Sequence, residues 1–253
     1  MELTILGSGC GIPSLERSAA GFLIRINDQP LLFDSGPGTL VRLLKASVNY
    51  KNLEHVFYTH THSDHCADLV PLIQALWTTP NFKKIEPLHL YGPSGFSNFL
   101  ETLSQAFGSW VIDPPFPLFI QELQSEKLEF SDFSVECRPM KHSAYSIGYR
   151  IENKTGSSIV YSGDTDYNND IIELAQNAGA LILECSFPEK RKMSGHLVPK
   201  EAAKIAAQSN CKQLILTHFY PPYEEVETEI YNIIPKIYKG ALFIAHDFFR
   251  LIV

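Results

Sequence analysis

The sequence predicts an α/β fold, a four-layer αββα sandwich in which two sheets pack face to face and helices cover both outer faces. Short apolar runs typical of strands come first in each half of the chain, and helical patterns follow them. No linker or low-complexity run divides the 253 residues, so we expect residues 1–253 to form a single domain. Histidine and aspartate gather directly after several apolar runs, which is where α/β folds place their chemistry.

The first half of the chain begins with strands and continues with helices. Leu69, Leu72, Ile73 and Leu76 have the spacing of one helix face. The predicted strands are Leu3–Leu6, Gly21–Ile26, Leu31–Asp34, His55–Thr59 and Leu88–Tyr91. The predicted helices are residues 36–45, Ala67–Thr78 and Gly95–Phe107.

The second half follows a stiff, proline-rich turn at residues 113–117. It adds further strands and then alternates strands with helices. Pro199 opens one of these helices, where its missing N–H costs nothing. The predicted strands are Leu118–Gln121, Lys127–Phe130, Ser134–Pro139, Ser146–Ile151, Ser157–Tyr161, Ala180–Glu184, Leu214–Thr217 and Ala241–Ala245. The predicted helices are Asp170–Gln176, Pro199–Ser209 and Glu224–Ile237.

Composition narrows the class of protein. The formal net charge is −7, which does not suggest a polyanion binder, although bound cations would reverse the charge locally. The cysteines are five in number, widely spaced and without a C-x-x-C pair, which favours a reducing compartment over a disulfide framework. No run approaches the ~18 apolar residues of a membrane span. We therefore expect a soluble cytoplasmic protein.

The segment from Tyr58 to His65 is the most informative part of the chain. Imidazole and carboxylate are ligands for a borderline divalent metal such as zinc, and they also accept manganese or iron. In an extended segment His60 and His62 point the same way and can hold one ion. Asp64 and His65 follow as the chain turns toward a helix, and they face another direction. This geometry predicts two metal ions rather than one.

Three more candidate ligands stand just past apolar runs: His142, Asp164 and His218. A lone histidine at a strand end is more commonly structural, but four such sites together indicate one centre. The glycine-rich loop at residues 7–11 does not predict a dinucleotide site. Ile12 stands where the third glycine belongs, and Pro13 follows it.

These motifs resemble those of the metallo-β-lactamase superfamily, and most closely its ribonuclease Z and phosphodiesterase branch. The resemblance covers nearly the whole chain and implies the metallo-β-lactamase fold. It rests on His-x-His-x-Asp-His at residues 60–65, His142-Ser143, Gly148-Tyr149-Arg150, Ser162-Gly163-Asp164-Thr165, residues 183–187, Gly195-His196 and residues 216–219.

The resemblance implies a dinuclear site in which Asp164 bridges two ions. Its ligands would be His60, His62 and His142 at one ion, and Asp64, His65 and His218 at the other. A hydroxide shared by two zinc ions would attack the substrate, with Asp64 orienting it. His196, backed by Glu184, would protonate the leaving group. Asp34 is either a residue that orients the ligands or a plain turn aspartate.

The chain departs from the ribonuclease Z pattern in two places. A short hairpin at residues 152–157 stands where that family inserts a long arm that grips transfer RNA, and Leu197-Val198-Pro199 replaces small hydroxyl residues. A small phosphodiester, cyclic or aryl-linked, is therefore the expected substrate, and nucleic acid is not favoured. Two alternatives stay open: a ribonuclease Z-like endonuclease that processes transfer-RNA 3′ ends, and a hydrolase of carboxylic, thio or sulfate esters.

Two other classes fit less well. Iron oxidoreductases on this scaffold commonly carry Glu in the cluster and a flavin domain, whereas this chain has His62 and no second domain. A non-catalytic scaffold would have lost ligands, whereas every position is filled.

The basic run Lys190-Arg191-Lys192 is expected to be solvated, with contact to a substrate phosphate as the alternative. A homodimer is implied by resemblance only, and no membrane partner is expected.

Overall fold

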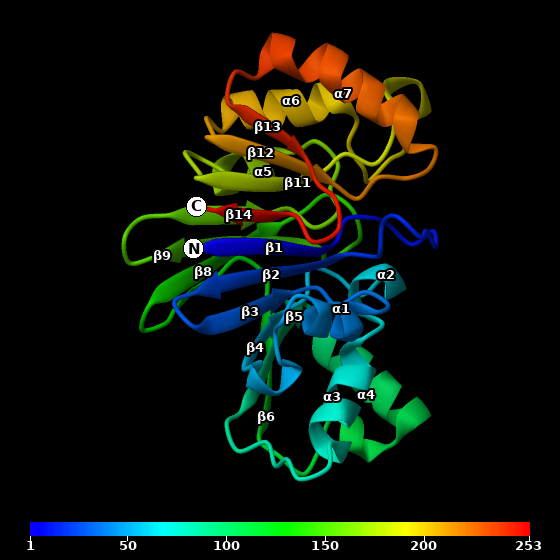
Figure 1. Cartoon of the computed structure of the whole chain (residues 1–253), viewed down its shortest axis with the longest axis vertical. Helices are drawn as coiled ribbons and strands as arrows, with labels where there is room; N and C mark the ends of the chain where they lie inside the picture. Colours follow the sequence, from blue (N-terminus) through cyan, green and yellow to red (C-terminus); the bar gives the residue numbers. More distant parts are fainter.

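The computed structural model describes all 253 residues and shows two mixed sheets packed face to face (Figure 1). The predicted four-layer αββα fold is confirmed. The first sheet runs in the order β14 (Arg250–Ile252), β1 (Glu2–Gly7), β2 (Gly21–Ile26), β3 (Gln29–Phe33), β4 (His55–Phe57), β5 (Leu88–Pro93) and β6 (Leu118–Leu123). The second runs in the order β13 (Ala241–Ile244), β12 (Gln213–Thr217), β11 (Ala180–Glu184), β10 (Ser158–Tyr161), β9 (Ile147–Asn153), β8 (Phe133–Pro139) and β7 (Lys127–Glu129).

Helices cover the outer face of each sheet, with α6 and α7 above the second sheet and α3 and α4 beside the first (Figure 1). The helices on the first sheet are α1 (Thr39–Lys45), α2 (Ser63–Cys66), α3 (Leu69–Thr78) and α4 (Phe96–Phe107). Those on the second are α5 (Asn169–Leu174), α6 (Pro199–Gln208) and α7 (Tyr223–Ile237). Short 3₁₀ turns are η1 (Tyr50–Asn52), η2 (Ser109–Val111) and η3 (Glu189–Arg191).

Three hydrophobic cores fill the three spaces between these four layers. Because side chains alternate along a strand, Phe57 faces the core between the sheets while its neighbour Val56 faces the helices. Ile182 and Leu183 divide in the same way on the second sheet. The central strands of each sheet are therefore buried on both faces and appear in the sequence as continuous apolar runs. This explains why short apolar runs located the central strands so closely.

The parallel strands set the position of the chemistry. In the first sheet β3, β4, β5 and β6 are parallel, and in the second β10, β11, β12 and β13 are parallel. Their carboxyl ends, together with the end of β8, lie toward one edge of the sandwich. Segments far apart in the sequence meet there, as the loops on the right of Figure 1 show.

The structure differs from the prediction at a few boundaries. The predicted helix Ala67–Thr78 begins at Leu69, and a separate short helix, α2, precedes it. Strand β14 was not predicted, because three residues are too few to show a period; it pairs with β1 and places the two chain ends side by side. The five cysteines are free and buried. None of the helices combines the length and apolarity needed to cross a membrane.

Candidate metal centre

Every predicted ligand lies at the shared edge of the two sheets. The segment after β4 carries four of them, and the ends of β8, β10 and β12 carry His142, Asp164 and His218. The structure brings these seven side chains into two adjoining groups: His60, His62, His142 and Asp164 in the first, and Asp64, His65 and His218 in the second.

The first group is compact. Nε2 of His142 lies 3.1 Å from Nδ1 of His62 and 3.6 Å from Oδ2 of Asp164. Nε2 of His60 lies 3.8 Å from the same oxygen. His60 and His142 are well shielded from solvent, whereas His62 is exposed. One cation can therefore be reached by four side chains from three separate loops.

The second group adjoins the first through Asp164. Nε2 of His65 and Nε2 of His218 lie 3.3 Å apart, and Oδ2 of Asp64 lies 3.4 Å from Nε2 of His218. Oδ1 of Asp164 lies 3.3 Å from His65 and 3.4 Å from His218. The two oxygens of Asp164 thus face different groups, which is the arrangement of a bridging carboxylate.

The donor set fits divalent cations. Nε2 of His60 and Oδ1 of Asp164 are buried and have no hydrogen-bond partner within the protein. A buried polar atom without a partner costs roughly 1–3 kcal/mol, and more when it is charged. A cation at each group satisfies these atoms, and imidazole with carboxylate is the donor chemistry of zinc.

Outer partners fix the ring orientation of two ligands. Nδ1 of His65 donates to Oδ2 of Asp34 at 2.7 Å, and Nδ1 of His142 donates to the carbonyl of Gly195 at 2.9 Å. With the proton held at Nδ1, the lone pair of Nε2 faces the centre, as metal binding requires. The buried Asp34 carboxylate also accepts from Thr59 and Tyr161. Asp34 directly follows β3, and its contacts favour the role of orienting ligands over that of a plain turn aspartate.

Hydroxyl groups fix the ring orientations of His60 and His218. Ser186 Oγ donates to Oε2 of Glu184 at 2.6 Å, so its lone pair is free to accept the Nδ1 proton of His218 at 3.0 Å. Thr59 Oγ1 connects Asp34 to Nδ1 of His60 in the same manner. Four of the five histidines therefore have Nδ1 engaged and Nε2 directed inward.

Glu184 and His196 form a hydrogen-bonded pair beside the second group. Nδ1 of His196 lies 2.9 Å from Oε1 of Glu184. The buried carboxylate also accepts from the amides of Thr165 and Leu197 and from Ser186. The ring of His196 stacks against His218 with centroids 5.8 Å apart. Glu184 thus links a candidate proton donor to a candidate ligand through one carboxylate.

Comparison with known proteins assigns the family. The description "Beta-lactamase superfamily domain" matches residues 30–219, which is three quarters of the chain and includes all seven candidate ligands. The chain belongs to the beta-lactamase superfamily. As the residues predicted, it is a metal-dependent hydrolase with ribonuclease Z relatives.

The relatives extend over nearly the full chain. A ribonuclease Z of Archaeoglobus fulgidus is 28% identical over 99% of this chain and 97% of its own length. A ribonuclease Z of Mycobacterium marinum is 31% identical over 87% of each. Among solved structures, the metallo-beta-lactamase fold protein YhfI of Bacillus subtilis superposes with a TM-score of 0.83 at 24% identity, covering 99% of this chain and 98% of its own. Human tRNase Z, short form, has a TM-score of 0.80 at 25% identity, covering 100% and 99%.

The protonation states of the candidate ligands in this superfamily member suit cation binding. Burial and the neighbouring His65 lower the pKa of His60 well below its ordinary value, and burial lowers the pKa of His142. Both rings are therefore neutral. Burial raises the pKa of Asp164, but the adjacent His218 and His65 outweigh it and hold that pKa well below its usual range. The Asp164 carboxylate is thus ionised and His60 and His142 are neutral, which are the forms that bind metal. Burial lowers the pKa of His65, but the carboxylates of Asp164 and Asp34 outweigh it and raise that pKa well above its ordinary value, so this ring has to release a proton when it binds a cation.

Glycine is the only residue type that fits at position 163. Its φ is +57°, and a Cβ there would lie 2.7 Å from the Cβ of Thr59. Such a contact is too short for any side chain. The glycine lets the end of β10 pass against the end of β4, and this brings Asp164 next to His60. The glycine of the Ser-Gly-Asp-Thr motif is thus required for steric reasons in this superfamily member.

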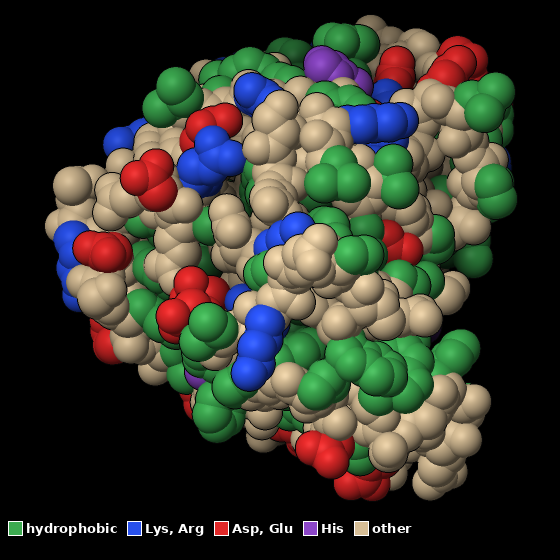
Figure 2. Space-filling view, turned by 60° about the horizontal axis from the view of Figure 1, so that its bottom comes forward, with side chains coloured by type: hydrophobic (Ala, Val, Ile, Leu, Met, Phe, Trp, Pro, Cys, Tyr) green, Lys and Arg blue, Asp and Glu red, His purple; other side chains and the backbone are tan.

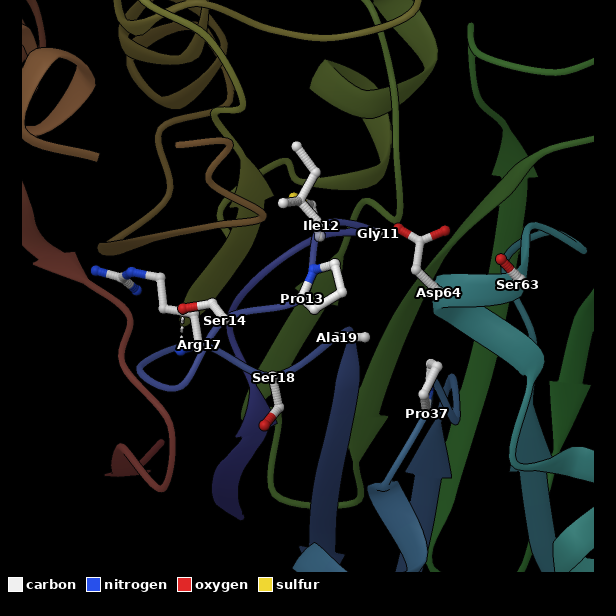
Figure 3. Close-up of a pocket in the computed structure, with 11 residues that line it drawn as sticks. Gly11, Ile12, Pro13, Ser14, Arg17, Ser18, Ala19, Pro37, Ser63 and Asp64 are labelled. Atoms are coloured by element: carbon white, nitrogen blue, oxygen red, sulfur yellow. Dashed lines mark hydrogen bonds between the residues drawn. The ribbon is translucent and has the colours of Figure 1, made fainter. Parts of the chain in front are cut away.

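The loop after β1 is a part of the site that the sequence did not reveal. It forms the wall of a ≈250 Å³ cavity beside Asp64, and the carbonyl of Ser8 accepts the amide proton of His218. In Figure 3 the Asp64 carboxylate lies next to Gly11, while the guanidinium of Arg17 points away from both. This loop carries no ligand pattern, so its only signal was the glycine-rich break after a buried strand. The cavity lining is Cys10, Gly11, Ile12, Pro13, Ser14, Arg17, Ser18, Ala19, Pro37, Ser63 and Asp64.

Ser186 was also missed, and it gives a first prediction. In Ser186→Ala, Nδ1 of His218 loses its acceptor and Oε2 of Glu184 loses a donor. We expect zinc affinity to fall by about 10–100-fold, as for other outer partners of metal ligands. Competition with a chromophoric chelator measures it. Ser209→Ala is the matched control, because Ser209 is equally buried and its hydroxyl donates to the carbonyl of Ala206, outside the two groups of ligands. Wild-type affinity in Ser186→Ala would contradict the role.

Proposed function

We propose that this chain hydrolyses phosphodiester bonds at a centre of two divalent metal ions. The observation that carries the proposal is the Asp164 carboxylate, whose oxygens each face a different group of ligands. The proposed ligands are His60, His62 and His142 for one ion, and Asp64, His65 and His218 for the other, with Asp164 shared.

When bound, such a pair lowers the pKa of water and stabilises the negative charge that develops on a phosphoryl group. The side chains of the chain do the rest. The carboxylate of Asp64 borders the cavity and can orient a water molecule by accepting its proton. His196 holds a proton for the leaving oxygen. Burial lowers the pKa of His196, but the hydrogen bond and charge of Glu184 outweigh burial and raise it.

Zinc is the proposed metal. Five of the seven candidate ligands are imidazoles, which suit zinc better than magnesium or calcium. Manganese and iron accept the same ligands, so metal analysis of the purified protein decides among them. An iron content near two per chain would overturn the choice of zinc.

A small phosphodiester is the proposed substrate class. The connection between β9 and β10 is a tight turn at residues 154–157, which is the place where the resemblance puts the arm that grips transfer RNA. The alignment with the Archaeoglobus fulgidus relative spans 304 positions, so at least about fifty have no counterpart in the 253 residues here. Lysine and arginine are scattered among other side chains on the face in Figure 2, without a continuous basic tract. These features favour cyclic or aryl-linked diesters.

Cleavage of precursor transfer RNA is the second candidate function. The similarity to ribonucleases Z, which extends over 99% of the chain for one of them, favours it. The same centre serves both substrates, because the chemistry at phosphorus is identical.

The single domain, the homodimer and the cytoplasmic location stay predictions, and gel filtration with light scattering tests the dimer.

The deciding experiment is a substrate panel with zinc-loaded protein, with and without chelator. It contains bis(p-nitrophenyl) phosphate, cyclic nucleotides, precursor transfer RNA, and carboxylic, thio and sulfate esters. We expect turnover of the small diesters that chelation abolishes and zinc restores. A higher kcat/KM for precursor transfer RNA would replace the substrate assignment. Turnover of only the non-phosphorus esters, or of nothing, would overturn the phosphodiesterase proposal.

A further inference from the structure

The basic run at residues 190–192 divides into two parts with different surroundings. Lys190 and Arg191 are ion-paired with Glu225 of α7 on the surface, in line with the predicted solvated loop. Lys192 is exposed as well, but its contacts differ. Its Nζ donates to Oδ1 of Asp166 at 2.7 Å, to Glu201 in the first turn of α6, and to the carbonyl of His196. The residue is exposed, but its ammonium group is bound to three protein oxygens.

Asp166 extends this network toward the metal centre. Its second oxygen, Oδ2, accepts from the amide of Gly195 at 3.1 Å. Its own amide donates to the carbonyl of Lys141 at 2.7 Å, directly before His142. Asp166 therefore connects the end of β10 to the end of β8 and to the loop that follows η3.

The loop held in this way touches two functional side chains. The carbonyl of Gly195 accepts the Nδ1 proton of His142, which directs Nε2 of that ring to the first group of ligands. The next residue, His196, has its carbonyl bound to Lys192 and its ring bound to Glu184. A shift of this short segment would turn a ligand and the proton donor together.

We propose that Lys192 is a positioning residue: its ammonium group, shared between Asp166 and Glu201, holds the 193–197 segment so that His142 and His196 keep their orientations. The inference rests on the proposed function for the role of His196, and on the candidate ligand set for His142. Two carboxylates with one partly buried ammonium make charge-assisted hydrogen bonds, which are stronger than neutral ones.

The test compares Lys192→Met, Lys192→Arg and Lys190→Met in the full chain. Methionine keeps the length of the lysine and removes its charge. We expect Lys192→Met to bind zinc about tenfold more weakly in chelator competition, at the lower end of outer-partner effects because Lys192 acts through a backbone carbonyl. Amide exchange of residues 193–197 should rise. Lys192→Arg restores both properties, and Lys190→Met, whose charge lies on the surface, changes neither.

Turnover supplies a second readout. Loss of His196 positioning lowers kcat more than it changes KM, and lowers it more for an alkyl leaving group than for p-nitrophenolate, which needs little protonation. If wild-type protein hydrolyses no phosphodiester, zinc affinity and amide exchange still decide the inference. It is overturned if Lys192→Met matches Lys190→Met in zinc affinity and exchange. If Lys192→Met does not fold, Asp166→Asn takes its place, and unchanged exchange of 193–197 there overturns the inference.

Discussion

Replacing Asp164 by alanine is expected to lower phosphodiesterase activity by at least ~10⁴-fold, equivalent to about 5.5 kcal/mol of transition-state stabilisation. The reason is geometric. Both oxygens of Asp164 are used, one toward His60 and His142, the other toward His65 and His218. In the proposed centre, its loss would remove a ligand shared by both ions and the negative charge between the imidazoles.

The measurement is kcat/KM for bis(p-nitrophenyl) phosphate together with metal content per chain. We expect Asp164→Ala to retain less than the two equivalents of the wild type. Asp28→Ala, at the exposed turn between β2 and β3, is the matched control and should behave as wild type. Two tightly held ions in Asp164→Ala would show that the carboxylate is not shared, and would leave the dinuclear assignment without its main support.

His196→Ala gives the second large effect. Without a proton donor, turnover should fall by roughly 10²–10⁴-fold while metal content stays near that of the wild type. The loss should be greatest for alkyl leaving groups and smallest for p-nitrophenolate. Glu184→Gln should show a similar dependence on the leaving group, because the carboxylate holds the Nδ1 proton of His196 at 2.9 Å.

This experiment also separates two interpretations of His196. Its ring, Asp164 and His218 present polar atoms within 4.8 Å of one another, which a metal ligand would also do. Loss of zinc from His196→Ala would therefore refute the proton-donor assignment and make His196 a ligand. His246→Ala, at an exposed histidine that belongs to neither group of ligands, controls for the loss of an imidazole.

Local pattern was sufficient for most of the fold. Strands buried on both faces appear as apolar runs, so β2 and β11 were predicted to the residue. The observed ends of strands differ from the predicted ends where a side chain takes the place of the neighbouring strand as hydrogen-bond partner. The amide of Thr59 donates to Asp34, so β4 ends at Phe57 instead of Thr59. The three residues of β14 are too few to show a period, and this strand forms through its pairing with β1 at the other end of the chain.

What the sequence by itself determined is the chemistry available: which residues can bind metal, and that each follows a strand whose carboxyl end lies at one edge. Only the tertiary structure decided how that chemistry is arranged. Contacts between residues far apart in the chain set the position of Asp164 between the two groups of ligands, the tautomers held by Gly195 and Ser186, and the ion pairs of Lys192. Hydrophobic periodicity and secondary-structure propensity do not indicate such contacts. A side-chain pattern shows which face of its own helix or strand is buried, but not which distant residue packs against that face.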